Sequence, residues 1–143
     1  MGKILGIDYG EVRTGLAITD QLQIITSPYK TLKSKSIKDL INKLDKIAQS
    51  ENIEKIVVGL PIGTSGKNTK RTNITLNFIK KLKHHFNISI ETVDERYSSD
   101  EAKELLIEQG IKTGHSKELI DKTAAAIILR RYLDEQQSIN KQN

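Results

Sequence analysis

The sequence predicts an α/β fold: a mixed five-stranded sheet whose first three strands are antiparallel, with helices on both faces. Near the N-terminus, apolar strand-like runs are joined by very short connections, which suits an antiparallel meander. Further along, apolar runs alternate with segments of helical periodicity, which suits parallel strands joined by crossover helices. The length of 143 residues is typical of one domain, so one domain over residues 1–143 is expected.

Three strands are expected in the first part of the chain. Residues 3–8 (KILGID) are mostly apolar and run into a turn at Tyr9-Gly10. A second run covers 13–19 (RTGLAIT), and a third covers 23–29 and ends around Pro28. Because the connections are short, these three strands should pair with their neighbours in chain order.

A helix and a buried strand should follow. Ser36 is expected to cap a helix in which apolar residues recur at three- and four-residue spacing from Ile37 to Ala48. Residues 53–60 (IEKIVVGL) have the continuous Val and Ile content of a strand that is covered on both faces. Residues 62–68 are rich in Gly and Ser, which predicts a loop.

The last part of the chain should be mainly helical. A helix around 74–82 is followed by a strand at 88–93. Ser98 and Glu101 have capping-box spacing for a short helix that ends at Gly110. A final helix is expected from about Ser116 to Tyr132 or Leu133, and the polar residues 134–143 are expected to form a disordered tail.

Charge is distributed unevenly along the chain. Lys and Arg number 23 against 18 Asp and Glu, for a net charge of +5. Residues 55–90 hold seven basic and no acidic side chains, whereas 91–143 hold eight basic and eleven acidic ones. A basic stretch beside an acid-rich remainder suits a protein that holds a polyanion and binds cations. The lack of Cys excludes disulfides, thiolate metal sites and a cysteine nucleophile.

The sequence shows no targeting or membrane segment. The N-terminus moves straight into a strand-like run without a signal-peptide core. The longest apolar runs are about six residues, far short of the roughly 20 that span a bilayer. A cytoplasmic protein without a membrane partner is therefore expected.

Acidic residues stand at the ends of two predicted strands. Asp8 ends the first strand, and Asp94 and Glu95 end the last one. Each could instead satisfy turn amides or pair locally, for example Glu95 with Arg96. Alone, these positions do not distinguish a functional from a structural role.

Asp121 is harder to explain as an ordinary surface acid. Its predicted helix face is shared with small and apolar residues, namely Ala124, Ala125, Ile128 and Tyr132. Burying an unpaired carboxylate costs several kcal/mol or more, so it needs a hydrogen bond, a salt bridge or a metal ion. A salt bridge with Lys117 near the helix start is the simpler alternative.

Considered together, the three acidic positions favour a metal site. If the first strand is central, the ends of the first and last strands and a helix packed across them would meet in one cleft. Carboxylates meeting there would repel one another unless cations were bound. Mg²⁺ or Mn²⁺ suits such oxygen ligands, and a pair of these ions is a common arrangement for hydrolysing phosphodiesters.

Four blocks of residues, taken together, match one family in content, order and spacing. The blocks are Gly6-Ile7-Asp8-Tyr9-Gly10 through Arg13-Thr14-Gly15-Leu16-Ala17, then Val57-Val58-Gly59-Leu60-Pro61, then Val93-Asp94-Glu95-Arg96-Tyr97-Ser98-Ser99, and Ile120-Asp121-Lys122-Thr123-Ala124-Ala125. Over roughly residues 3–133 the chain resembles the YqgF/RuvX family of pre-16S rRNA nucleases, also called Holliday-junction-resolvase-like proteins.

The resemblance implies an RNase H-like fold and Mg²⁺-dependent (or Mn²⁺-dependent) cleavage of nucleic acid in the cytoplasm, during 5′-end maturation of small-subunit ribosomal RNA. It implies catalytic and metal-binding roles for Asp8, Glu95 and Asp121, with Asp94 as an alternative ligand. A structured rRNA precursor is favoured over branched DNA as partner, and ribosomal particles are further candidates. A monomer and a homodimer are both compatible with it.

The chain departs from the family pattern in two places. After Gly-Leu-Pro the family commonly has a loop with Asn and Asp, whereas this chain has residues 62–66 (IGTSG). After Asp-Glu-Arg the family commonly has Leu-Thr-Thr, whereas this chain has Tyr97-Ser98-Ser99. Substrate contacts of the first loop are therefore not carried over.

Several basic residues are candidates for holding phosphates. They are Arg13, Lys67, Lys70, Arg71 and Arg96. Gly10 and Gly15 in the first hairpin could let backbone amides approach an anion. Residues 61–68 resemble a Walker A loop, but Pro61 replaces its first Gly and Asn68 its Ser or Thr, which disfavours a nucleotide-binding phosphotransferase.

The sequence is also compatible with two other functions. A Holliday-junction-type DNA resolvase would share the metal chemistry and would be expected to act as a dimer. A non-catalytic RNA- or ribosome-binding protein would keep the fold and use the acidic residues structurally.

Overall fold

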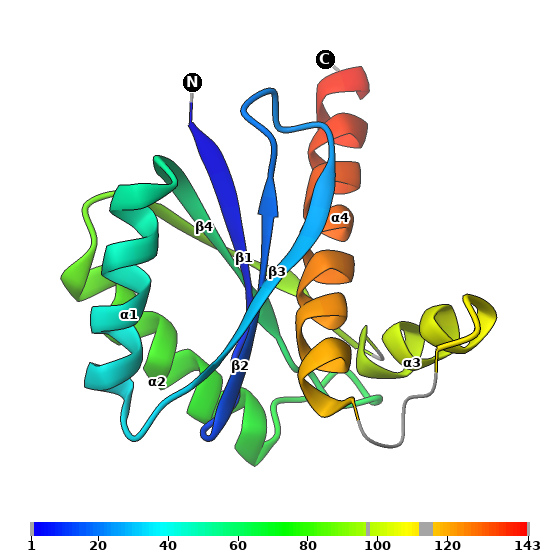
Figure 1. Ribbon diagram of the computed structural model, residues 1–143, viewed down its shortest axis with the longest axis horizontal. Helices are drawn as coiled ribbons and strands as arrows, with labels where there is room; N and C mark the ends of the chain where they lie inside the picture. The colour runs from blue at the N-terminus through cyan, green and yellow to red at the C-terminus, as the bar shows by residue number, and fades with distance from the viewer. Residues whose placement is uncertain (1, 97, 112–115, 143) are drawn as a thin grey trace.

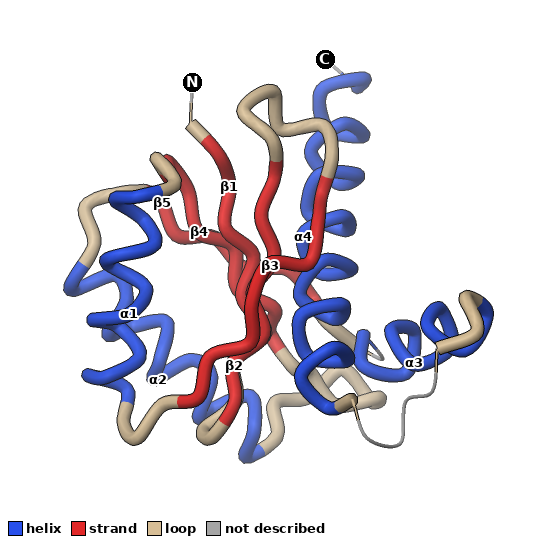
Figure 2. Tube along the Cα trace, viewed as in Figure 1, coloured by secondary structure: helices blue, strands red, loops and turns tan. Residues whose placement is uncertain are grey.

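The protein folds as a layered α/β structure (Figures 1 and 2). The computed structural model describes residues 2–96, 98–111 and 116–142, with side chains up to residue 139. Its elements are β1 (Lys3–Asp8), β2 (Arg13–Thr19), β3 (Thr26–Lys33), α1 (Ile37–Ser50), β4 (Ile53–Leu60), α2 (Lys70–His85), β5 (Ser89–Asp94), α3 (Ser98–Glu108) and α4 (Lys117–Gln142).

The five strands form one mixed sheet in the order β3-β2-β1-β4-β5. The β1–β2 and β2–β3 pairs are antiparallel, whereas β1–β4 and β4–β5 are parallel. This confirms the predicted sheet and makes β1 the central strand. The C-terminal ends of β1, β4 and β5 therefore lie at one edge of the sheet.

Helices cover both faces of the sheet, as predicted (Figure 2). Leu5 and Ile7 of β1 pack in the core beneath α1 and α2, while Ile4 packs in the core beneath α4. The alternation follows from the two-residue period of a strand. By the same period, Asp8 belongs to the α4 face. Helix α3 packs against α4 rather than on the sheet.

Three glycines let α4 lie close to the sheet. A Cβ atom at Gly15 would lie 2.0 Å from the backbone oxygen of Asp121, and one at Gly59 would lie 2.5 Å from the Ile128 side chain. A Cβ at Gly6 would lie 3.0 Å from Leu129 Cβ. Gly15 is thus needed for the close approach of α4.

A polar cluster fixes α4 across the parallel half of the sheet. The Tyr132 hydroxyl donates to Glu91 Oε2 at 2.7 Å and accepts from Lys55 Nζ at 2.8 Å. Lys55 and Glu91 also form an ion pair at 2.9 Å. Because these groups come from α4, β4 and β5, the cluster holds all three elements in register.

The third strand lies later than predicted, at Thr26–Lys33 instead of 23–29. The Asp20 carboxylate accepts hydrogen bonds from the backbone amides of Ile24 and Ile25, at 2.8 and 3.0 Å, which holds that segment in a turn. Pro28 does not end the strand. It is tolerated because β3 is an edge strand, and the register shifts next to it.

The predicted end of α3 is confirmed, whereas the predicted end of α4 is not. Gly110 ends α3 in a left-handed conformation with φ of 78°, and Ile111 N donates to Leu106 O, as in a Schellman motif. Helix α4 continues to Gln142, so the predicted helix end at Tyr132 or Leu133 was wrong. None of the described helices is long and apolar enough to cross a membrane.

We predict that Gly15→Ala will destabilise the protein by about 1–3 kcal/mol, because the new methyl group would displace the backbone of α4. Urea unfolding followed by circular dichroism measures this. Gly6→Ala is the matched control and should cost less, since its closest neighbour is a side-chain carbon at 3.0 Å. Equal stability of Gly15→Ala and wild type would contradict the packing described here.

Candidate active site

Asp8 lies at the C-terminal end of the central strand. It pairs with Gly15 across the β1–β2 ladder and is 7% exposed. Burial raises the pKa of Asp8 well above its usual value, and the neighbouring Glu95 carboxyl raises it further through charge and a hydrogen bond. Asp8 is therefore the member of this pair that keeps a proton most readily.

Glu95 follows β5 directly and is also 7% exposed. Its backbone amide donates to Leu60 O at 3.2 Å, which extends the strand pairing by one residue and sets the direction of the side chain. The Ser98 hydroxyl donates to Glu95 Oε2 at 2.9 Å. Burial raises the pKa of Glu95, although hydrogen bonds from Ser98 and Asp8 oppose the shift.

Asp121 comes from the second turn of α4 and is partly exposed. Its Oδ2 accepts a hydrogen bond from Arg13 Nε at 2.8 Å, with side-chain exposures of 22% for Asp121 and 33% for Arg13. The salt bridge is therefore made with Arg13 on β2 and not with Lys117. The α4 neighbours expected of Asp121, which are Ala124, Ala125, Ile128 and Tyr132, are all buried.

A small polar pocket brings Asp8 and Asp121 together, whereas Glu95 is not among its lining residues. It has a volume of about 300 Å³, and Asp8, Asp121, Arg13, Arg71 and Ser99 are among its lining residues. We call it the acidic pocket. The positive charge of Arg71 favours ionisation of both Asp8 and Glu95 and so lowers the pKa of each, against the larger effect of burial.

The donor set of this site suits a hard divalent cation, because it offers carboxylate oxygens from three elements. Asp8 and Glu95 are in contact, and ionising both would leave a buried repulsion that a cation would relieve. Within the described ranges, however, no three acidic or histidine side chains are already arranged around one point. Asp121, the third carboxylate, is instead paired with Arg13.

Asp94 is placed differently from Glu95, although the two are adjacent. Asp94 is exposed and its Oδ2 lies 3.0 Å from Arg96 Nε. Its Oδ1 accepts a hydrogen bond from the Arg96 amide at 3.0 Å. The structure therefore brings Glu95, and not Asp94, to Asp8, and it pairs Arg96 with Asp94.

The five basic residues expected to hold phosphates lie in different parts of the structure. Arg13 and Arg71 line the acidic pocket, and Lys70 lines the pocket next to it. Neither Lys67 nor Arg96 lines the acidic pocket. Lys67 lies in a tight hairpin in which Gly63 N donates to Lys67 O at 3.0 Å. That hairpin also differs from a phosphate-binding loop, which would wrap around the start of a helix.

Ser98 has a role that sequence reasoning missed. It was predicted to cap α3, yet it lies within that helix and its hydroxyl binds the Glu95 carboxylate. The three-residue spacing between Glu95 and Ser98 at a strand-to-helix junction is the feature that could have indicated this contact. Tyr97, which stands between them, lies outside the described residues.

The strand order, with a carboxylate at the end of the central strand and a helix carrying another across it, defines the RNase H-like class of α/β proteins. Comparison with protein families makes the assignment specific. A family model described as the Holliday junction resolvase RuvX matches residues 2–135, and the chain belongs to this family.

Relatives with a shared name match the chain over nearly their full length. A protein of Endomicrobium trichonymphae named "Putative pre-16S rRNA nuclease" is 41% identical over 135 residues, covering 94% of this chain and 96% of its own. A protein of the same name from Natranaerobius thermophilus is 36% identical, and 99% of each chain is covered.

Solved structures with low sequence identity share the fold. A RuvC from T. thermophilus in complex with a Holliday junction substrate aligns with a TM-score of 0.61 at 11% identity, covering 96% of this chain and 97% of its own. The Fowlpox virus resolvase, solved with Holliday junction DNA, aligns with a TM-score of 0.57 at 14% identity, covering 94% and 98%. These likenesses confirm the predicted RNase H-like fold.

We predict that Asp8→Asn stabilises the metal-free protein at neutral pH. Burial raises the pKa of Asp8 and of Glu95 in the folded state. Below the unfolded-state pKa values of about 4, both carboxyls are protonated and their contribution to stability is complete. As pH rises through the higher pKa values of the folded state, that contribution to the free energy of unfolding is lost. In EDTA, the Tm of Asp8→Asn should exceed that of wild type at pH 8, and the difference should vanish near pH 4.

Scanning calorimetry across this pH range measures the effect. Asp134→Asn, which changes an exposed carboxylate on α4, is the matched control and should follow wild type. A Tm for Asp8→Asn at or below that of wild type at pH 8 would show that the two buried carboxyls do not destabilise the folded protein.

Proposed function

We propose that this protein is a divalent-metal-dependent nuclease whose acidic pocket hydrolyses phosphodiester bonds. The observation that carries the proposal is the buried contact of Asp8 with Glu95, beside Asp121 and two arginines. A folded protein keeps two buried carboxyls together at some cost in stability. A site that binds cations offsets that cost when it is occupied.

Asp8, Glu95 and Asp121 would hold Mg²⁺ or Mn²⁺, which supplies activation of the attacking water and stabilisation of the leaving oxygen. The Ser98 hydroxyl orients Glu95 by donating to Oε2. Arg71 and Arg13 line the pocket and would hold the oxygens of the phosphate that is cleaved. Lys70, Lys67 and Arg96 would contact phosphates farther along the strand.

Arg13 has a second role in this proposal, because it holds Asp121 through the 2.8 Å hydrogen bond. A substrate phosphate competes with Asp121 for the Arg13 guanidinium. When Arg13 turns to the phosphate, Asp121 is released toward the other two carboxylates. Substrate binding would therefore complete the metal site.

The substrate favoured here is a precursor of 16S ribosomal RNA, cleaved during maturation of its 5′ end in the cytoplasm. The names of the curated relatives support this choice. The description of the matching family favours a second candidate, a Holliday junction in DNA. A protein that binds RNA or ribosomal particles without cleaving would have the same fold and no need of a complete metal site.

One experiment separates these functions. Wild type and Asp8→Asn are incubated with pre-16S rRNA and with a four-way DNA junction, each with and without Mg²⁺. We expect cleavage of the RNA by wild type only with Mg²⁺, and a loss of roughly a thousandfold in Asp8→Asn, because several kcal/mol of transition-state stabilisation would be removed.

Asp134→Asn serves as the control and should cleave as wild type does. Symmetrical cutting of the junction by a dimer would identify a resolvase instead. Binding of pre-16S rRNA without cleavage under Mg²⁺ or Mn²⁺ would identify a binding protein, and full activity of Asp8→Asn would refute the proposed site.

We predict opposite effects of Arg13→Ala on metal binding and on cleavage. Without nucleic acid, removing the guanidinium frees Asp121, so Mn²⁺ affinity measured by titration calorimetry should rise about three- to tenfold. Cleavage should fall by about tenfold or more, since a charge-assisted phosphate contact is lost. Arg130→Ala, an exposed arginine on α4, should change neither. Unchanged Mn²⁺ affinity in Arg13→Ala would contradict the release of Asp121.

A further inference from the structure

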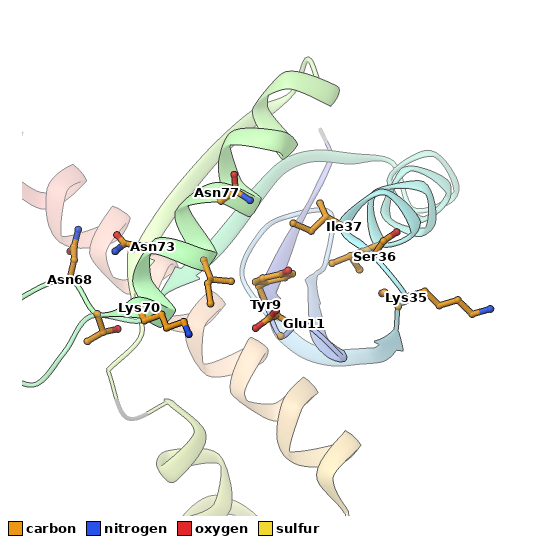
Figure 3. A pocket seen from close by; sticks show the side chains of 14 residues that line it. Tyr9, Glu11, Lys35, Ser36, Ile37, Asn68, Lys70, Asn73 and Asn77 are labelled. Atoms are coloured by element: carbon orange, nitrogen blue, oxygen red, sulfur yellow. The ribbon is translucent and has the colours of Figure 1, made fainter.

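A second and larger pocket lies next to the acidic pocket, between α1 and α2. Its volume is about 800 Å³, within the usual range for small-ligand sites. Figure 3 shows Tyr9 at its centre, with Asn73 and Asn77 on α2 to one side and Ser36 and Ile37 from the start of α1 to the other. We call it the α1–α2 pocket.

The floor and the rim of this pocket have different chemistry. The Tyr9 ring, stacked on Phe78 with centroids 4.1 Å apart, forms a rigid floor together with Ile37, Ile74 and Leu40. The rim carries side-chain amides from Asn68, Asn73 and Asn77. An apolar floor under a few polar groups is the usual composition of a site for a flat, polar-edged ligand.

The polar rim is concentrated on one stripe of α2. Lys70, Asn73 and Asn77 are three and four residues apart, so they lie on one face of the helix beside its buried face. Within the part of the chain that the structure describes, the amides of Asn73 and Asn77 make no side-chain hydrogen bond. Their donors and acceptors are free to meet a ligand.

The start of α2 is unusually positive. Its first two residues are Lys70 and Arg71, and its first turn has no acidic residue. Cations at a helix N-terminus oppose the helix dipole, which favours negative charge there. Arg71 lines the acidic pocket and Lys70 lines the α1–α2 pocket, so this turn presents one cation to each. Lys35, in contrast, extends away from the other labelled residues in Figure 3.

The two pockets are adjacent. Tyr9, Gly10 and Glu11 line both of them, so a strand whose phosphate lies over Asp8 can place a neighbouring nucleotide in the α1–α2 pocket. The carboxylate of Glu11 repels a phosphate at this border, but it can accept a hydrogen bond from a sugar hydroxyl or a base amino group. These features together suit a nucleotide whose phosphate lies toward Lys70.

We propose that the α1–α2 pocket binds one unpaired nucleotide of the strand that is cleaved in the acidic pocket. The base lies on the floor formed by Tyr9, its polar edge bonds to Asn73 and Asn77, and its phosphate contacts Lys70. Amide side chains suit this task because they donate and accept toward base edges. The proposal rests on the proposed nuclease function and adds a requirement for an unpaired nucleotide beside the cleaved bond.

Fluorescence anisotropy tests this site in an Asp8→Asn background, which prevents cleavage. The probes are duplexes with one bulged nucleotide and fully paired duplexes of the same sequence, each made as RNA and as DNA. Asn73→Ala/Asn77→Ala should weaken binding of the bulged duplex about tenfold or more, because hydrogen bonds to the base are lost. Binding of the paired duplex should stay within twofold.

Asn42→Ala, an exposed asparagine on α1 outside the pocket, is the matched control and should bind as the parent does. Because Asn73 and Asn77 are exposed helix positions and Ala favours helix, the double variant should keep the parent's Tm. The RNA and DNA arms show whether the pocket prefers a ribose hydroxyl.

Equal binding of the bulged duplex by the parent and the double variant, or equal losses for bulged and paired duplexes, would overturn the subsite. Cleavage by the protein without Asp8→Asn, assayed on the same duplexes with Mg²⁺, is the separate readout of nuclease function. Cleavage together with an unaffected double variant refutes only the subsite. If the parent binds none of the probes, the subsite is refuted as well.

Discussion

The close contact between the start of α4 and strand β2 determines the geometry of the site. At Gly15 the backbone of α4 leaves no room for a Cβ atom, since one would lie 2.0 Å from Asp121 O. Gly15 is also the ladder partner of Asp8. The backbone of Asp121 is therefore held opposite the end of the central strand by this packing. Gly59, next to Glu95, likewise lets the Ile128 side chain of α4 approach the sheet closely.

This packing places negative charge where water is scarce. Asp8 and Glu95 are each 7% exposed, and this burial raises the pKa of both. The charge of the Glu95 carboxyl raises the pKa of Asp8 further. The protein balances this charge with Arg71 near the pair and Arg13 on Asp121. Both arginines also have the donors that bind phosphate, so under the proposed function the groups that neutralise these carboxyls would also hold the substrate. Under the proposed nuclease function, the protein would give up stability without cations in exchange for affinity toward cations and phosphate.

The sequence predicted the parts of the molecule that depend on local pattern. Continuous apolar runs identified β1 and β4, and capping chemistry located Ser36 and Gly110. Contacts between distant residues could not be predicted in this way. Arg13 and Asp121 are 108 positions apart, so Lys117 was the obvious local partner. The packing role of Gly15 likewise depends on a helix that arrives more than 100 residues later, and the late start of β3 depends on a turn held by Asp20.

The central claim is that Asp8, Glu95 and Asp121 form one divalent-cation centre. Crystals of the protein grown with Mn²⁺ and a short nucleic acid, measured at the manganese absorption edge, test it most directly. An anomalous peak within about 2.5 Å of carboxylate oxygens of Asp8 and Glu95, with Asp121 turned from Arg13 toward the metal, is the predicted result. Ordered carboxylates with nucleic acid bound and no manganese between them at saturating Mn²⁺ would contradict it.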